Sequence, residues 1–170
     1  MSNATAIAGV SPHKESVILS IWPSVGSTGI GRGIGLLCDC IPLRINGISV
    51  SAAIFALPLA PLAALIYLLL KAGGKKYTLT RKSIQCWSSI GQQLIKSVPL
   101  SEISEIRVEQ QSGQAFYKAA DIVLLGADGG IRMRVPGVTS PLTFQQNIQE
   151  TQQAISETAA SLEVIKKRNN

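Results

Sequence analysis

Residues 48–70 read ISVSAAIFALPLAPLAALIYLLL, and this stretch governs how the rest of the chain is interpreted. It contains no charged side chain. As a helix it would be about 34 Å long at ~1.5 Å per residue, which exceeds the ~30 Å hydrocarbon core of a bilayer. A buried helix of a soluble domain rarely stays apolar on every side for this length. We therefore predict a membrane segment with the anchoring residues Ile48, Phe55, Pro58, Pro61, Tyr67 and Leu70.

Two prolines near the middle of this segment, Pro58 and Pro61, leave two topologies open. One is a kinked helix that spans the bilayer, because prolines are tolerated in lipid when neighbouring groups bond the freed carbonyls. The other is a re-entrant hairpin that turns at Leu57–Pro61 and never crosses. The spanning helix is the preferred interpretation.

The preceding residues 30–45 are also apolar but carry Arg32, Asp39 and Arg44. An acid at the centre of a bilayer costs about 2.5–3.5 kcal/mol, so this stretch is a poor independent span. It fits either an amphipathic helix in the interface or a short first leg of a hairpin that turns at residues 44–47. The Gly31–Gly35 spacing leaves two interpretations open, namely close helix packing, because small residues let backbones approach each other in lipid, or an irregular or interfacial loop.

Basic residues without an intervening acid follow the apolar run directly. They are Lys71, Lys75, Lys76, Arg81 and Lys82. Positive charge next to a membrane segment holds that flank in the cytoplasm, which alone explains the cluster. The same residues would attract anionic lipid by about 1 kcal/mol each. Specific headgroup binding would need a pocket on the first hairpin, which Lys76 and Arg81 flank. Nucleic-acid binding is not expected, because the charge is tied to the membrane junction.

The overall composition agrees with a membrane segment attached to a small domain. The 170 residues carry a net charge of +6, and charged residues make up 15% of the chain, whereas about a quarter is usual for soluble domains. We divide the chain into a polar N-terminal tail (1–22), a membrane-associated region (23–71), a folded domain (75–157), and a helix end with a basic tail (158–170).

Short strands with turn signals fill the folded domain. They are predicted at 76–80, 83–87, 92–98, 103–110, 120–125 and 131–135. Residues 126–130 (GADGG) predict a hairpin turn, and Pro136 with Gly137 is expected to end the last strand. Tyr77 and Trp87 are interpreted as packing residues.

A helix is predicted to follow the strands, with Ser140 as its N-cap and Pro141 in its first turn. Its expected apolar face consists of Phe144, Ile148, Ile155, Ala159 and Leu162, and its polar face of Gln145, Gln146, Gln149, Glu150 and Gln152. The predicted fold class is α+β, mainly β, with an open barrel or sandwich capped by the C-terminal helix.

The chain resembles the membrane-anchored bacterial pleckstrin-homology-like domain family over residues 23–157. The resemblance rests on an ordered set of short motifs, namely Lys75–Thr80 after the anchor, Ile95–Ile103, Ala120–Leu124 before a glycine turn, and Pro136–Val138 before the helix at Pro141. It implies a small β-barrel capped by a helix, on the cytoplasmic side of a bacterial inner membrane. Family members often have two plain hydrophobic spans, whereas the first stretch here is charged.

Residues for catalysis or metal binding do not form a recognisable set. The acidic residues Glu102, Glu105, Glu109, Asp121 and Asp128 are expected to lie mostly on strand faces and turns that meet water, and the sequence shows no sign of the pocket that paired acid–base carboxylates need. The single histidine, His13, lies in the tail, and Cys38, Cys40 and Cys86 are expected to be buried thiols in a reducing compartment. We predict a non-enzymatic scaffold without metal or cofactor. Its partners would be membrane lipids and either a protein or a second copy, and the alternative is a sensor of anionic lipid.

Overall fold

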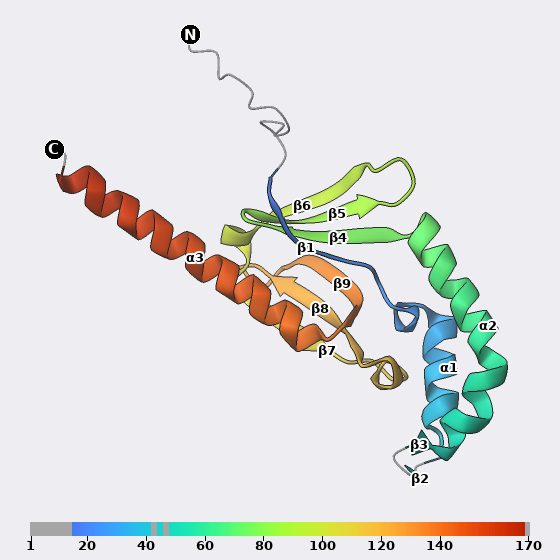
Figure 1. Cartoon of the computed structure of the whole chain (residues 1–170). Coiled ribbons are helices and arrows are strands. Elements are labelled where there is room, and N and C mark those ends of the chain that lie inside the picture. Colours follow the sequence, from blue (N-terminus) through green and yellow to red (C-terminus); the bar gives the residue numbers. More distant parts are fainter. Residues whose placement is uncertain (1–14, 42–43, 46–47, 169–170) are drawn as a thin grey trace.

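The structure is a computed structural model that describes residues 15–41, 44–45 and 48–168. It is an α+β fold of two antiparallel sheets, a pair of N-terminal helices and a long C-terminal helix (Figure 1). The N-terminal elements are β1 (Val17–Ile21), the 3-10 turn η1 (Val25–Ser27), α1 (Gly29–Asp39), β2 (Arg44–Ile45), β3 (Ile48–Ser49) and α2 (Val50–Gly73). The domain follows with β4 (Lys75–Thr80), β5 (Ser83–Ser88), β6 (Leu94–Pro99), η2 (Leu100–Glu102), β7 (Glu105–Glu109), η3 (Ala115–Tyr117), β8 (Ala119–Leu125), β9 (Ile131–Thr139) and α3 (Pro141–Arg168).

The first sheet has the order β1-β4-β5-β6, so a strand from before the membrane region pairs with the strand that follows it. Ser20 lies opposite Thr78 and Ile21 opposite Tyr77. Val17–Ile21, within the segment interpreted as a polar tail, thus form a strand. This strand is the edge neighbour of β4, the first strand of the domain predicted to begin at residue 75.

The second sheet is a meander of β7, β8 and β9. The predicted turn at 126–130 is confirmed: the Gly126 amide donates to the Gly130 carbonyl at 2.9 Å, and Gly129 has a φ of +72°. Pro136 and Gly137 do not end the last strand, since β9 continues to Thr139. A bulge there sets two residues of β9 opposite Asp121, and Gly137 takes a φ of +59° that favours glycine.

The hydrophobic core lies between the two sheets and α3, and no closed barrel is formed. Its members include Tyr77, Leu79, Ile84, Leu100, Ile122, Leu124, Val135, Phe144 and Ile148. The predicted packing role of Tyr77 is thus confirmed, and burial raises the pKa of its phenol.

Helix α3 begins at Pro141 as predicted, and Phe144 and Ile148 of its predicted apolar face are buried. Ile155 on the same face is exposed, and Ala159 and Leu162 lie among residues whose side chains are not described. Two glutamines of the predicted polar face bond to the domain. Gln145 donates to the Ile106 carbonyl at 3.1 Å, and Gln152 donates to the carbonyls of Leu100 and Ile103 at 2.9 Å each.

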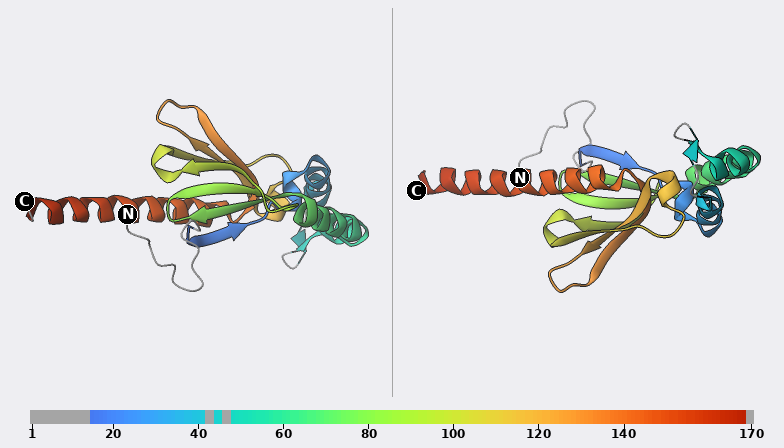
Figure 2. Two further views of the ribbon diagram at one scale, coloured as in Figure 1. Left: turned by 90° about the horizontal axis from the view of Figure 1, so that it is seen from above. Right: turned by 90° about the horizontal axis from the view of Figure 1, so that it is seen from below.

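Helices α1 and α2 pack against each other and are joined through the short β2–β3 ladder. This arrangement agrees with the hairpin interpretation of residues 30–45. Helix α2 runs without a break through Pro58 and Pro61, so a re-entrant turn at Leu57–Pro61 is not formed. Both views in Figure 2 place the helix pair at one end of the sheets and the free end of α3 at the other.

Candidate membrane-facing site and its junction with the domain

Helix α2 presents a broad apolar face that nothing in the described chain covers. It is the one described helix that is long and apolar enough to cross a membrane, and no residue of its most apolar stretch is fully buried. Leu57 is 82% exposed. The other exposed large apolar residues of this helix are Ile54, Leu62, Leu65, Tyr67, Leu68 and Leu69. Such a face is unfavourable in water, at about 25 cal/mol per Å² of apolar surface.

The predicted anchoring residues have different positions in this helix. Pro58, Pro61 and Tyr67 are exposed, whereas Phe55 and Leu70 are half-buried. Ile48 is not part of the helix, because it belongs to β3 and α2 begins at Val50. The helical segment therefore starts two residues later than the predicted apolar run and continues three residues beyond it.

The opposite face of α2 is half-buried along its whole length. The half-buried residues recur every three or four positions, at Ala52, Phe55, Ala56, Leu59, Ala63, Ile66 and Leu70. In its first turn, the Ser51 hydroxyl is buried and donates to the Cys38 carbonyl of α1 at 2.5 Å. Helix α2 thus lies against the rest of the molecule from its first turn to its last.

Helix α1 joins α2 to the domain through two glycines. A Cβ atom on Gly31 would lie under 3.0 Å from the Val25 backbone, and one on Gly35 would lie under 3.0 Å from the Gly113 carbonyl oxygen. Gly31 and Gly35 lie in a helix and not in an irregular loop, but their close contacts are with η1 and with the loop before η3, not with another helix. The Tyr117 hydroxyl donates to the Gly31 carbonyl at 2.9 Å, and burial raises the pKa of this phenol, which keeps the donor protonated.

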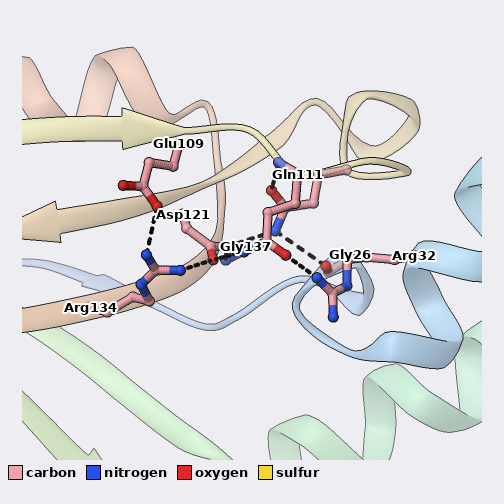
Figure 3. Close-up of polar contacts among 8 residues, drawn as sticks. Gly26, Arg32, Glu109, Gln111, Asp121, Arg134 and Gly137 are labelled. Carbon is pink, nitrogen blue, oxygen red and sulfur yellow. Dashed lines mark hydrogen bonds and ion pairs between the residues drawn. The ribbon is translucent and has the colours of Figure 1, made fainter.

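A polar network below this contact centres on Asp121 of β8 (Figure 3). The side chain is buried, at 4% exposure, and accepts four hydrogen bonds. The donors are Gln114 Nε2 at 2.7 Å, the Gly137 amide at 2.9 Å, Gln111 Nε2 at 3.0 Å and Arg134 at 3.5 Å. The expectation that Asp121 faces water is therefore wrong, since the bulge in β9 turns the Gly137 amide toward it.

The network extends in two directions from Asp121. Arg134 also pairs with Glu109 of β7 at 2.6 Å, on the surface of the second sheet. On the other side, the amide oxygen of Gln111 accepts a hydrogen bond from Arg32 of α1. Figure 3 shows Arg134 and Arg32 at opposite ends of the group. Arg32, which the sequence predicts in the membrane-associated region, thus bonds to the domain.

The predicted basic cluster is divided by the first hairpin. Lys71 lies in the last turn of α2, 5.9 Å from the Tyr67 ring centre, and Lys75 and Lys76 begin β4. Arg81 and Lys82 form the turn after β4, at its other end. Six residues of extended strand separate Lys75 from Arg81, about 20 Å at ~3.3 Å per residue. The five side chains therefore do not form one pocket.

A groove of about 430 Å³ lies on the outer face of the first sheet, between the two tryptophans Trp22 and Trp87. Lys76 is 5.9 Å from the centre of the Trp22 ring, and Trp87 Nε1 donates to Gln85 at 3.0 Å. Trp87 is thus not a core residue but part of an aromatic and polar groove. The sequence held no signal that would bring Trp22 to it, because Trp22 follows the unpredicted strand β1.

At one end of this groove, the carboxylate of Glu15 accepts hydrogen bonds from Thr80 at 2.5 Å, Ser83 at 2.8 Å and Gln85 at 3.1 Å. The hydrogen bond from Thr80, followed by that from Ser83, lowers the pKa of this carboxyl below its usual value, although desolvation acts in the opposite direction. The carboxylate of Glu15 therefore links the segment that leads into β1 to the turn between β4 and β5.

Among residues 15–41, 44–45 and 48–168, no group of three or more histidines, cysteines and acids has the geometry to hold a metal ion. Cys38 and Cys86 are buried as expected, whereas Cys40 is exposed, so the expectation of a buried thiol is wrong for Cys40. His13 lies outside the described residues. In comparisons with models of protein families, with characterised proteins and with solved structures, no significant match to this chain was found.

Proposed function

We propose that this chain is a non-catalytic interaction module, held at the cytoplasmic face of a bacterial membrane by α2. The observation that carries the proposal is the uncovered, charge-free face of α2, joined to the folded domain through α1. Lipid is the solvent in which that face is stable. Lys71, Lys75 and Lys76 at the domain end of α2 support a cytoplasmic location for the domain.

We further propose that the domain is of the pleckstrin-homology-like kind. Two sheets of four and three strands with one capping helix agree with the fold that the resemblance implies, apart from the closure of the barrel. The ordered motifs lie on β4, on β6 with η2, on β8 and on the end of β9. Domains built of sheets and a helix bind peptides along open edges and grooves.

An open groove of about 940 Å³ runs between the β4–β5 turn and α3 and suits a protein partner or a second copy of this chain. Its walls combine the apolar Ile18 and Ile155 with the charged Arg81, Lys82 and Glu150. Apolar residues within a charged rim are typical of protein-binding surfaces. Ile155 is 39% exposed, although it belongs to the apolar face of α3.

The test is isolation of the full chain in mild detergent, followed by measurement of its mass and of the proteins bound to it. We expect a complex, and we expect Ile155→Glu to dissociate it, whereas Gln153→Glu, on the exposed surface of the same helix, leaves it intact. A chain that is always monomeric and always isolated alone would contradict the interaction role.

Sensing of anionic lipid is the second candidate, because Lys71, Lys75 and Lys76 gather where α2 meets the first sheet. Replacing these three by glutamine should weaken the partition of freshly synthesised full-length chain onto anionic vesicles by about 3 kcal/mol, roughly 100-fold. Arg81→Gln with Lys82→Gln is the matched control, since both lie at the far end of β4. Equal effects of the two sets of changes would exclude a localised lipid site.

A further inference from the structure

We infer that α2 lies along the membrane surface, with both of its ends on the cytoplasmic side, and does not cross the bilayer. This inference rests on the proposal that lipid covers the exposed face of α2. It differs from the spanning helix that the sequence alone favours. Three observations on α1, α2 and the domain carry it.

The first observation is that both ends of α2 are held close to the domain. At its end, Gly73 and Gly74 lead directly into β4, and the Ser89 amide donates to the Gly74 carbonyl at 3.0 Å. At its start, Ser51 bonds to Cys38 of α1. Cys38 is one helical turn, ~4.5 Å along the axis, from Gly35, which touches the domain at Gly113.

These attachments are incompatible with a crossing helix. The 24 residues of α2 extend about 36 Å, so a spanning α2 would place Ser51 and Gly73 on opposite sides of a hydrocarbon core of ~30 Å. The domain touches both regions, and its loop at residues 111–114 and its buried Asp121 would then lie at membrane depth. Polar loops of this kind do not occur in contact with the hydrocarbon region.

The second observation is the half-buried stripe of α2, which runs from Ala52 to Leu70. A spanning helix below a cytoplasmic domain would be packed only at its cytoplasmic end. A helix that lies against the side of the molecule has one packed face and one free face along its whole length. Helix α2 has the second pattern, and Figure 1 shows it beside α1, with its last turn meeting the first sheet at β4.

The third observation concerns the two prolines. Pro58 and Pro61 lack the amide groups that would bond the carbonyls of Ile54 and Leu57 in a regular helix. Ile54, Leu57 and both prolines are exposed, so they lie on the part of α2 that lipid or water would contact. At the level of the headgroups water can bond these carbonyls, whereas the hydrocarbon core offers no donor.

Lipid fits the free face better than a second copy does, because of what surrounds it. Lys71 and Lys75 are exposed at the end of α2, and Ile90, at the tip of the β5–β6 hairpin, is 70% exposed beside Gly73. Basic residues near the surface attract anionic headgroups, so this end of α2 suits contact with one face of a membrane.

The test locates the two ends of α2 with a maleimide–polyethylene glycol reagent that does not cross membranes. Cys40→Ser removes the exposed native thiol and leaves Cys38 and Cys86, which are buried. Into this background we would place either Asp39→Cys, at the end of α1 beside Ser51, or Ala72→Cys, at the end of α2; both positions are exposed. Asp39 is chosen because its carboxylate requires water whether α2 lies along the membrane surface or crosses the bilayer.

We expect both thiols to react in inside-out membrane vesicles and neither to react in spheroplasts, with the Cys40→Ser chain as the unlabelled control. Reaction of the Asp39→Cys thiol in spheroplasts, with the Ala72→Cys thiol reacting in inside-out vesicles, would show a spanning helix and overturn the inference. Protection of the Asp39→Cys thiol until detergent is added would show an inserted hairpin and also overturn it. Recovery of the chain in the soluble fraction would refute the proposed membrane role itself. This outcome is distinct from the two labelling patterns that overturn only the orientation of α2.

Discussion

The contact between α1 and the domain makes a sharp prediction for two neighbouring glycines of one helix. At Gly35 an added methyl group would meet the Gly113 carbonyl and, at 3.1 Å, the ring of Tyr117. At Gly33 nothing lies within 4 Å of that position. Alanine is favoured over glycine in a helix by about 1 kcal/mol, and this gain applies equally to both sites.

The free energies of unfolding of the two variants should therefore differ by the cost of overpacking at Gly35, which is about 1–3 kcal/mol. We expect Gly33→Ala to stabilise the protein by about 1 kcal/mol, and Gly35→Ala to leave it unchanged or destabilise it by up to about 2 kcal/mol. For a difference near 2 kcal/mol, the Tm values of the two variants would lie roughly 4–8 °C apart for a chain of this size.

The measurement is thermal unfolding of the full-length chain in one mild detergent, followed by the fluorescence of its two tryptophans, Trp22 and Trp87. Both variants carry the same chemical change in the same helix, so differences in helix propensity and in detergent binding cancel. A Gly35→Ala protein as stable as the Gly33→Ala protein would mean that α1 is not docked on the loop at Gly113. The inference that α2 lies along the membrane would then lose its first support.

Two further predictions concern the polar contacts around the sheets. Asp121→Asn places an NH2 group opposite one of two pairs of donors, either Gln114 and Gly137 or Gln111 and Arg134. It should lower the free energy of unfolding by about 3 kcal/mol, whereas Asp128→Asn in the exposed turn should change it by less than about 0.5 kcal/mol. Equal denaturant midpoints for these two variants would show that the hydrogen bonds accepted by Asp121 do not stabilise the fold. The second prediction concerns Glu15, whose pKa in the folded chain is lowered from 4.5. The ionised carboxylate of Glu15 therefore contributes fully to stability above that pH, and its contribution is lost as the pH falls through the folded pKa. Glu15→Gln should flatten this acid dependence of Tm, and an unchanged pH profile would show that the contacts with Thr80 and Ser83 are not made in solution.

The features that the sequence predicts well are those set by local pattern. The uncharged run gave α2 to within two residues at its start, and the strands around 76–80, 83–87 and 131–135 follow from alternation with turn residues between them. The start of α3 follows from Pro141, whose fixed φ suits a first helical turn. Each of these signals lies within the element that it predicts.

The features that the sequence does not reveal depend on contacts between distant residues. Strand β1 is short, and its partner β4 lies beyond both helices, so no local pattern indicates the pairing. In the sequence, Asp121 resembles a solvent-facing acid. The bulge in β9 brings the amide of Gly137, 16 residues later, to its carboxylate. The basic residues looked like one cluster because sequence spacing does not show that a strand carries Arg81 and Lys82 away from Lys75.

The central claim is that lipid covers the free face of α2, and sedimentation of the full-length chain from a detergent-free lysate tests it most directly. The account predicts that the chain pellets with the membranes and is released by mild detergent. It also predicts that the combined change of Leu57, Leu65 and Leu68, all exposed, to glutamine moves much of it into the supernatant. A folded wild-type chain that remains in the supernatant after ultracentrifugation would contradict the claim.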